Sequence, residues 1–492
     1  MVLYVTNQNC EKQMPENVFI GRKHELELLS GLKQKNSASL VVIYGRRRVG
    51  KSRLAGEFGK NSKFYSFEGL YPEKGTTNQD QLAAFYERYS SYFPAKQTPF
   101  TDWLQAFDHL AKKCTKGKIV ILLDEISWMG AKDANFLGKL KTSWDLEFKK
   151  NSNLVLILCG SVSSWIEKRL LAHKGFYGRI SIKLRLKEQP LSDCNKYWQT
   201  HGSALSAYEK FKVLSVTGGV PKYLEEISPS QSAEENIRRL CFTQEGILFN
   251  DYSYIFASTL ERDSILYQKI VQTLCKHNLL RNEILASLDK QSGGLITSYI
   301  DELEMAGFVD RDFTWNLKTG DLSKISQYRL SDNYIRFYTK YIMPVVPKVK
   351  NGRYSLSSLG SLSGWSSIMG LQIENLLLNN RPAVLNLIGI YQDEVICDGP
   401  FFQRTTAKIQ GCQIDYLVQT KLGVLYLCEI KFTRTRITTK IINEVQEKIN
   451  RLATPKRLSI VPVLLYMGDI QDEVIDSQFF GRTINIEQLL NE

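Results

Sequence analysis

The sequence predicts a multidomain α/β protein, and its length and apolar patterning are the observations behind this expectation. The chain has 492 residues, which at roughly 100–200 residues per domain corresponds to about three domains. Residues 40–44, 119–123 and 154–159 are short apolar runs rich in Val, Ile and Leu, which is typical of buried strands in an α/β sheet. The hydrophobic content of 43% is ample for packed cores and excludes wholesale disorder.

Charge and cysteine usage limit the partners and the compartment. The net charge of +13 favours polyanionic partners, namely nucleic acid, nucleotides or an anionic membrane surface. The nine cysteines form no CxxC pair, so we expect reduced thiols in an intracellular protein and no zinc site. The N-terminal extension, residues 1–16, lacks the pattern of a signal peptide, and no apolar run approaches the roughly 18 residues of a membrane span. We therefore expect a cytoplasmic protein without a membrane partner.

A phosphate-binding pattern follows the first apolar run. The pattern G-x-x-x-x-G-K-S lies between that strand and a helical stretch, and it consists of Gly45, Arg46, Arg47, Arg48, Val49, Gly50, Lys51 and Ser52. Glycines let the backbone curl so that its N–H groups face a phosphate, and the N-terminus of the helix adds partial positive charge. Lys51 can then reach the β- and γ-phosphates of a nucleotide, and Ser52 can ligate Mg²⁺. A chance glycine-rich turn is the alternative, and the strand–loop–helix context counts against it.

Polar residues also follow the second and third apolar runs. Asp124 would hold Mg²⁺ through water and Glu125 would polarise the attacking water, although such a pair can instead cap a helix. Ser161, after the third run, could sense the γ-phosphate or orient water. Arg179, in GFYGRISIKLRL, could stabilise transition-state charge in this subunit or in a neighbour, and the alternative is a surface arginine.

The order of these motifs carries a family resemblance. FIGRKHELELL, the P-loop, LLDEISW, the Gly-Ser pair, YGR and GGVPKYLEEI follow one another over roughly residues 17–250, and this order resembles the archaeal-type AAA+ ATPases, relatives of the STAND signalling NTPases. The resemblance implies an ATPase core at 17–186, a helical lid at 187–257, ATP as the ligand and a phosphate contact from Lys222. One departure is Ser161, where many AAA+ proteins have Asn. AAA+ relatives form rings and STAND-like ones can be monomeric until activated, so a homo-oligomer formed on ATP binding stays open.

Residues 258–345 predict a winged helix-turn-helix. Three helical stretches are followed by a strand–turn–strand pattern, and in DNA binders the third helix enters the major groove. Here the third stretch carries Asp301, Glu302 and Glu304 and no Lys or Arg. This acidity favours an internal packing or switching role over DNA reading.

The following segments are predicted as core and linker. Residues 328–342 form a helix with an aromatic stripe, which is more often core than a base-stacking platform, and its members are Tyr334, Phe337, Tyr338 and Tyr341. The polar stretch 346–364 predicts a linker.

Residues 411–436, GCQIDYLVQTKLGVLYLCEIKFTRTR, predict two strands joined by a turn. Residues two apart in a strand share a face, so Glu429 and Lys431 stand side by side while Ile430 points into the opposite layer. The hairpin brings Asp415 on the first strand close to Glu429. A surface salt bridge between Glu429 and Lys431 is the plain alternative to a metal site.

Helical stretches flank this hairpin and complete a second resemblance. Glu374 lies among apolar neighbours on the helix before it, where a carboxylate needs a partner or a metal, and Gln446 lies on the helix after it. The order of Glu, Asp, Glu-x-Lys and a Gln-bearing helix resembles the PD-(D/E)XK nuclease superfamily over roughly residues 365–470. The resemblance implies a restriction-endonuclease-like α/β domain at 365–492.

The second resemblance also implies roles for these side chains. The ligands of Mg²⁺, or of Mn²⁺, beside the scissile phosphate would be Glu374, Asp415 and Glu429. Lys431 would orient the attacking water. DNA, favoured over RNA, would be held by Gln446, Arg434 and Arg436. The alternatives are a nuclease-like domain that binds without cutting, as in an ATP-dependent scaffold, and a nucleotide-dependent assembly factor without nucleic acid.

Overall fold

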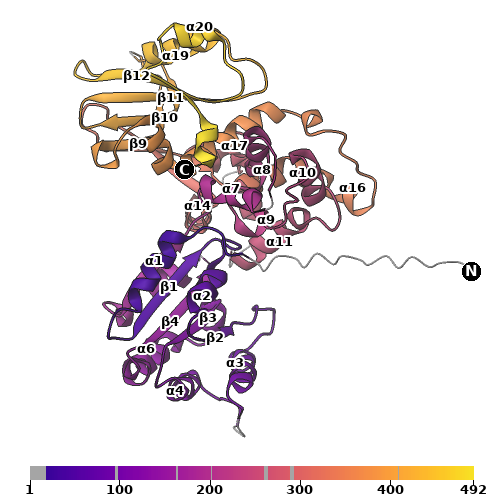
Figure 1. Ribbon diagram of the computed structural model, residues 1–492, viewed down its shortest axis with the longest axis vertical. Helices are drawn as coiled ribbons and strands as arrows, with labels where there is room; N and C mark the ends of the chain where they lie inside the picture. Colours follow the sequence, from indigo (N-terminus) through magenta and orange to yellow (C-terminus); the bar gives the residue numbers. More distant parts are fainter. Residues whose placement is uncertain are drawn as a thin grey trace, which may run out of the picture.

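The computed structural model describes residues 18–94, 98–161, 165–200, 202–259, 264–288, 293–407 and 409–491. The N-terminal extension expected at 1–16, with Cys10, lies outside these residues. Figure 1 shows an N-terminal α/β lobe, drawn from indigo to magenta, below a larger helical and β-sheet body that ends in the yellow C-terminal strands. None of the helices in the described ranges is long and apolar enough to span a membrane.

The N-terminal lobe is built on a parallel sheet with the strand order β2-β3-β4-β1-β5. Its strands are β1 (Ser39–Gly45), β2 (Lys63–Glu68), β3 (Ile119–Asp124), β4 (Leu154–Ser161) and β5 (Ile180–Leu186). Strands β1, β3 and β4 contain the three predicted apolar runs, and they are almost wholly buried because apolar clusters cover both faces of the sheet. The predicted α/β class is therefore confirmed for this lobe.

Helices cover both faces of this sheet. They are α1 (Lys23–Leu32), α2 (Lys51–Gly59), α3 (Asn78–Tyr92), α4 (Trp103–Lys113), α5 (Ile126–Met129) and α6 (Phe136–Leu146). The helical lid segment that follows contains α7 (Leu191–Gln199), α8 (Ala207–Thr217), α9 (Pro221–Leu224), α10 (Ala233–Cys241) and α11 (Ile247–Thr259). Figure 1 shows these helices within the upper body, with α8 beside α17 and with α9 and α11 nearest the parallel sheet.

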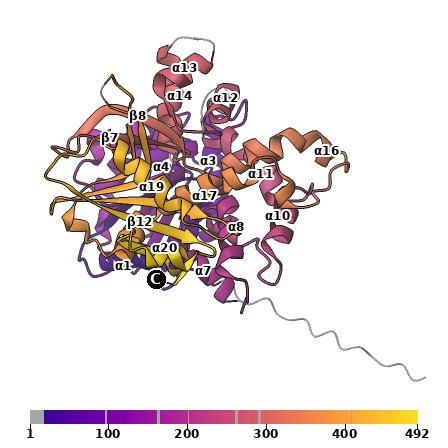
Figure 2. The same ribbon diagram turned by 90° about the horizontal axis from the view of Figure 1, so that it is seen from above.

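The next segment combines three helices with a small antiparallel sheet of order β6-β8-β7. Its elements are α12 (Ser264–Leu274), β6 (Leu279–Leu280), α13 (Arg281–Ser287), α14 (Gly293–Ala306), β7 (Val309–Trp315) and β8 (Leu322–Leu330). We call this segment, 264–330, the three-helix segment. Figure 2 shows α12, α13 and α14 beside one another at one edge of the molecule.

The aromatic stripe and the predicted linker are both packed. Helix α15 (Asn333–Phe337) runs into a π-helical turn, Tyr338–Ile342, and all four aromatic residues of the stripe are buried, which confirms their core role. The predicted linker differs from the structure, because 346–364 includes α16 (Val346–Lys350) and buries Val349, Leu356 and Leu359. These spaced apolar residues supply the burial that the polar composition of the stretch concealed.

The C-terminal sheet is mixed and has the order β13-β12-β11-β10-β9. Strands β9 (Val395–Gln403), β10 (Cys412–Thr420) and β11 (Val424–Phe432) are antiparallel, whereas β12 (Ser459–Met467) and β13 (Arg482–Asn485) run parallel to β11. Helix α17 (Trp365–Asn379) packs on one face of this sheet and α19 (Lys440–Arg451) on the other. Two shorter helices complete the domain, α18 (Arg381–Ile388) and α20 (Asp472–Asp476).

One apolar core joins the lid, the three-helix segment and the C-terminal sheet. It runs from Leu191 to Leu490 and includes buried residues of α8, α14, α15, α17 and β11. Polar bonds reinforce it, since Asn375 on α17 donates to the Leu330 carbonyl at 2.9 Å and Gln372 donates to the Asn333 carbonyl at 2.7 Å. Figures 1 and 2 both place α17 against α8. The eight described cysteines are free, and all except Cys397 are buried.

Candidate functional site

The loop after β1 has the geometry of a phosphate cradle. Arg48 and Gly50 adopt left-handed φ angles of 69° and 87°, which lets the loop curl ahead of α2. Gly50 is the N-cap of α2 and has no side chain to bond the first N–H groups of the helix, so they remain available for an anion. Lys51 is only 5% exposed, and its Nζ donates to the carbonyls of Gly45 at 3.3 Å and Arg46 at 3.1 Å. The ammonium group therefore lies inside the curl of the loop.

Two hard oxygen ligands meet beside this loop. The Oγ of Ser52, on the first turn of α2, donates to the carboxylate of Asp124 at the end of β3. The second oxygen of Asp124 accepts the Glu125 N–H at 3.0 Å, which orients the carboxylate. A hydroxyl and a carboxylate at one point form a donor set that suits Mg²⁺. The parallel pairing of β3 with β4, next to β1, brings these side chains together although 72 positions separate them in the sequence.

Glu125 lies deeper in the same site. Its backbone is left-handed, with φ 46°, and its side chain is only 9% exposed. Burial raises the pKa of its carboxyl, while the Lys51 ammonium opposes that rise. The Oγ of Ser161, at the end of β4, lies 3.4 Å from one Glu125 oxygen. A carboxylate with a raised pKa beside a phosphate cradle is suited to accept a proton from water.

A cavity of about 580 Å³ opens onto these residues. One wall comes from the loop and includes Arg47, Lys51 and Glu125, and the other comes from the lid and includes Pro221 and Lys222. The volume lies within the range of small-molecule and cofactor pockets. Lys222 stands at the rim, where Glu226 holds its Nζ at 2.7 Å.

Arg179 lies apart from this cavity. Its guanidinium forms a bidentate pair with Asp145 on α6, at 2.9 Å and 2.8 Å, and this pairing holds the pKa of Asp145 well below its usual range. Arg179 is absent from the described residues that line the cavity. Within one chain, the structure does not bring Arg179 to the phosphate loop.

Two arginines of the loop pair with carboxylates, Arg46 away from the cavity lining and Arg48 within it. Arg46 is 7% exposed and pairs with Glu188 and with Asp332, each at 2.7 Å. Arg48 pairs with Asp251 on the lid helix α11 at 2.5 Å. Burial raises the pKa of Glu188 to about 7 and also raises that of Asp332, while the shared Arg46 guanidinium opposes both rises. Sequence reasoning missed these roles, since no spacing connects the loop to Asp332.

Asp415 lies at a β-bulge in the C-terminal sheet. The pairing of β10 with β9 shifts between Ile414 and Leu417, so β10 carries an extra residue there. Bulges of this kind re-aim side chains and are frequent next to active sites. One oxygen of Asp415 accepts the Ile430 N–H at 3.0 Å, which fixes the carboxylate against β11.

Two lysines surround Glu429 on the neighbouring strand. Glu429 is only 3% exposed, and Lys431 contacts it at 3.1 Å as the strand spacing predicts. Lys448 on α19 contacts Glu429 at 2.5 Å and Asp415 at 3.4 Å, so one ammonium lies between the two carboxylates. Burial alone would lower the pKa of Lys448, but these carboxylates outweigh burial and raise it.

Glu374 faces this cluster from α17. Burial raises its pKa to about 8, and the charge of Asp415 adds to that shift. Burial likewise raises the pKa of Asp415, and the neighbouring Glu429 adds to it. Even so, within the described ranges no group of three His, Cys, Asp or Glu side chains lies close enough to hold a metal ion.

The remaining predicted residues lie at the edge of the cluster. Gln446 is exposed and donates to Asn450 on its own helix at 2.9 Å, so the side chain that α19 directs to the carboxylates is Lys448. The heptad-like register of α19 decides this, because Ile441 and Val445 are buried and place Lys448 on the inner face. Arg434 pairs with Glu209 of the lid, and Arg436 is exposed.

Comparisons with known proteins bear on the N-terminal lobe. Residues 19–227 match the model of a family described as an ATPase domain predominantly from Archaea. The uncharacterised protein MJECL04 of Methanocaldococcus jannaschii is 25% identical over 350 residues, which are 70% of this chain and 73% of the relative. An ATP-binding protein of the same organism, MJ0423, is 48% identical over 46 residues, 9% of this chain and 78% of the relative. The Walker-type ATPase PABY2304 of Pyrococcus abyssi is 15% identical, with a TM-score of 0.48 over 65% of this chain and 96% of that one.

The family match spans the phosphate loop, the Asp124–Glu125 pair and the first lid helices. Its extent agrees with the parallel sheet and with the cavity between loop and lid. Residues 19–227 therefore carry an ATPase domain, and the chain is an enzyme that binds and hydrolyses ATP.

Proposed function

We propose that this ATPase is a nucleotide-controlled switch whose C-terminal domain, 365–492, is a metal-dependent nuclease-like effector that acts on DNA. The observation that carries this proposal is a pair of neighbouring carboxylates, Asp415 at a β-bulge of β10 and the buried Glu429 on β11, with Lys431 on the same strand as Glu429. The mixed sheet between α17 and α19 supports it, because that layer order suits a restriction-endonuclease-like domain.

The nucleotide half of the proposal assigns roles around the phosphate loop. Ser52 and Asp124 would hold Mg²⁺ with the ATP phosphates, and Lys51 would neutralise charge on the β- and γ-phosphates. Glu125 would take the proton of the attacking water, and Ser161 would orient that carboxylate. Lys222 would reach the phosphates from the lid after leaving Glu226.

The carboxylate cluster fits a cation. Lys448 already places one positive charge between Asp415 and Glu429, and both ligands are hard oxygens. A bound Mg²⁺ or Mn²⁺ would polarise the scissile phosphodiester and activate water. Asp415 and Glu429 would hold the ion, Glu374 would join them on losing its proton, and Lys431 would orient the water.

Buried contacts connect the two halves. Arg46 of the phosphate loop pairs with Asp332, whose carboxylate also accepts the Ile335 N–H at the start of α15. Helix α15 is bonded in turn to α17, which carries Glu374, through Asn333 and Gln372. A change at the phosphate loop would therefore shift the helix that bears one of the carboxylates.

The three-helix segment has the element order of a winged helix, and its contacts favour a switching role for it. Arg185 on β5 donates to the Met305 carbonyl at the end of α14 at 3.0 Å, so the ATPase sheet holds this helix. The acidic residues Asp301 and Glu304 lie on the same helix. Both features count against insertion of α14 into a DNA groove.

The test is cleavage of supercoiled plasmid and of single strands with Mg²⁺ or Mn²⁺, with and without ATP. We expect the wild-type protein to cut, and Asp415→Ala and Lys431→Ala to cut at least about a hundredfold more slowly. Glu444→Gln is the matched control, because it changes an exposed carboxylate that contacts Lys431 and to which the proposal assigns no role in holding the ion. Wild-type protein that hydrolyses ATP but cuts nothing would refute the nuclease half of the proposal.

A second candidate has its own observation. Lys448 is held by both carboxylates, and the described part of the chain contains no group of three His, Cys, Asp or Glu side chains that could hold a metal ion, which also fits a nuclease-like domain that binds nucleic acid without cutting it. Metal-dependent cleavage separates the two candidates, because the binding-only domain would show none.

A further inference from the structure

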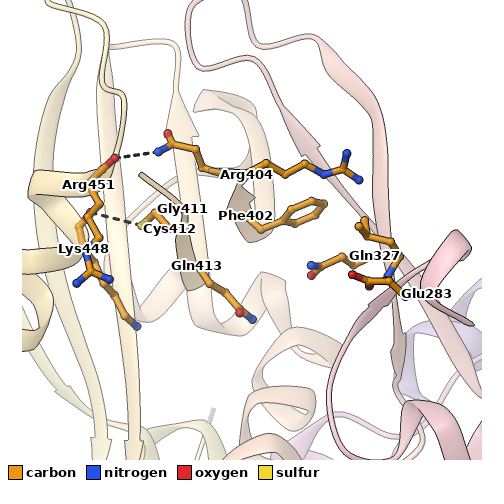
Figure 3. Close-up of a pocket in the computed structure, with 11 residues that line it drawn as sticks. Glu283, Gln327, Phe402, Arg404, Gly411, Cys412, Gln413, Lys448 and Arg451 are labelled. Atoms are coloured by element: carbon orange, nitrogen blue, oxygen red, sulfur yellow. Dashed lines mark hydrogen bonds between the residues drawn. The ribbon is translucent and has the colours of Figure 1, made fainter. Parts of the chain in front are cut away.

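A polar pocket of about 550 Å³ lies between the three-helix segment and the C-terminal domain. Figure 3 shows Lys448 and Arg451 on one wall and Glu283 and Gln327 on the other. Arg404 extends from the end of β9 across the pocket toward the second wall. None of the roles assigned above uses this space.

The charge of the pocket favours an anion. Arg404 and Arg451 bring two cations to its lining beside Lys448, whose charge Asp415 and Glu429 balance, and Glu283 is the one acid among the residues described there. Arg404 and Arg451 are exposed, and Arg451 also pairs with Glu447 on its own helix at 2.8 Å, so a ligand would compete with that surface ion pair. Arginine is well suited to phosphate, which its planar fork can bind through two hydrogen bonds.

The pocket adjoins the carboxylate cluster through Lys448. This residue lines the pocket and also contacts Asp415 and Glu429. Gln413, two residues before Asp415 on β10, lies in the lining as well. A strand held by the arginines would therefore lie next to the residue that contacts both carboxylates.

The two walls are fixed to each other. Thr314 on β7 donates to the Phe402 carbonyl at 2.8 Å, and the indole N–H of Trp315 donates to Gln419 at 2.8 Å. Both bonds are buried, and Trp315 packs in the same apolar cluster as Phe401. Widening the pocket would break these contacts and leave buried polar groups unpaired, which is unfavourable.

The fixed width selects the form of the nucleic acid. A pocket of this volume is in the range that holds one small-molecule ligand, which corresponds to a nucleotide or two of an unpaired strand. A duplex would have to bring both strands into the same space. The amides of Gln327 and Gln413 can bond the edges of bases that are free of a pairing partner.

We propose that this pocket is the entry for a single-stranded nucleic acid, which it guides over Asp415 and Glu429. The inference rests on the proposed nuclease-like function and specifies its substrate as an unpaired strand or a flap. Arg404 and Arg451 bind the phosphates, and the wall from β6, α13 and β8 excludes the partner strand.

The experiment measures binding of fluorescent single-stranded DNA, single-stranded RNA and duplex DNA to the full chain in EDTA, so that cutting cannot interfere. The first variant, Arg404→Ala with Arg451→Ala, removes two phosphate contacts. The second, Gln413→Trp, fills the pocket without changing charge. The matched control is Lys440→Ala, which removes another exposed cation of α19 outside the pocket.

We expect both pocket variants to weaken single-strand binding by tenfold or more, and the control to stay within twofold. For the double arginine variant, the slope of the logarithm of the single-strand binding constant against the logarithm of the salt concentration should become shallower by about 1.4. A preference for single-stranded DNA or for single-stranded RNA supports the inference and shows which of the two nucleic acids the pocket binds. Two results would overturn the inference. One is that the pocket variants bind single strands as tightly as the wild-type protein does. The other is that the wild-type protein binds duplex as tightly as single strands and the pocket variants lose both to the same extent.

These outcomes separate this inference from the proposed function. Single-strand binding that depends on the pocket, without cleavage under any metal, would remove the nuclease and keep the strand-binding pocket. Cleavage that needs Asp415 but is unchanged in both pocket variants would keep the nuclease and remove the pocket.

Discussion

The phosphate loop and the carboxylate cluster each hold a lysine, the buried Lys51 and the partly buried Lys448, but in opposite electrostatic surroundings. Lys51 is bonded to two neutral carbonyls, so its positive charge is available to an anion. Lys448 is bonded to two carboxylates, so its charge is already neutralised and the site as a whole attracts a cation. The comparison teaches that one lobe is preorganised for phosphate itself and the other for a positive charge that would sit beside a phosphate.

The largest effect should come from the phosphate loop. Lys51→Ala removes the cation nearest the β- and γ-phosphates, so ATP hydrolysis should fall by about a thousandfold. A steady-state phosphate-release assay measures it, with Lys60→Ala at the exposed end of α2 as control. Normal hydrolysis by the Lys51→Ala protein would break the first half of the comparison.

The next effect concerns the carboxylates shared by Arg46. The folded state raises the pKa of Glu188 from 4.5 to about 7, so the folded protein keeps this proton over a range in which the unfolded chain has lost it. The contribution of Glu188 to the free energy of unfolding is therefore fully present below pH 4.5. It is lost as the pH rises toward 7, and the loss is on the order of 2–3 kcal/mol. In the Glu188→Gln variant, the denaturation midpoint should change less between pH 4.5 and pH 7 than it does in the wild-type protein.

Lys448 and Gln446 provide a paired test on one helix. Lys448→Met leaves Asp415 and Glu429 without their shared cation, so stability in EDTA should fall by about 1–3 kcal/mol. Mn²⁺ should recover that loss, because the ion would take the place of the ammonium. Gln446→Ala should change stability by less than about 0.5 kcal/mol, since its side chain bonds only to Asn450 on the surface. Equal losses in both variants would contradict the assigned geometry.

A smaller effect tests the connection between the lobes. Asp332→Asn keeps an oxygen for the start of α15 but removes the charge that pairs with Arg46. The ratio of single-strand cleavage with and without ATP should shrink by a few fold, as expected for a coupling of roughly 0.5–2 kcal/mol. An unchanged ratio, with ATP hydrolysis intact, would place the coupling elsewhere.

The smallest effect should come from Arg179. Its guanidinium is held by Asp145 and does not line the described part of the nucleotide cavity, so Arg179→Ala should change dilute-solution ATP hydrolysis by less than about threefold. A large loss that appears only at high protein concentration would instead assign it to a neighbouring subunit.

The sequence allowed some parts of the C-terminal site to be predicted and not others. Glu429 and Lys431 followed from strand periodicity, because residues two apart share a face, and Asp415 followed from the predicted hairpin. The sequence did not predict which side chain of α19 reaches the carboxylates. Gln446 and Lys448 could both serve by residue type, and only the packing of Ile441 and Val445 decides which one faces inward. Composition also suggested a linker at 346–364 that the structure buries.

The sequence by itself determined the local chemistry of this protein: a glycine-framed loop ahead of a helix, acids at strand ends and a Glu-x-Lys strand. These features depend on residues close together in the chain, where backbone geometry limits the outcomes. Only the tertiary structure decided which distant groups share a charge, as with Arg46 and Asp332 or Lys448 and Asp415. Such pairs form because burial makes an unpaired charge costly, and burial is a property of the whole fold.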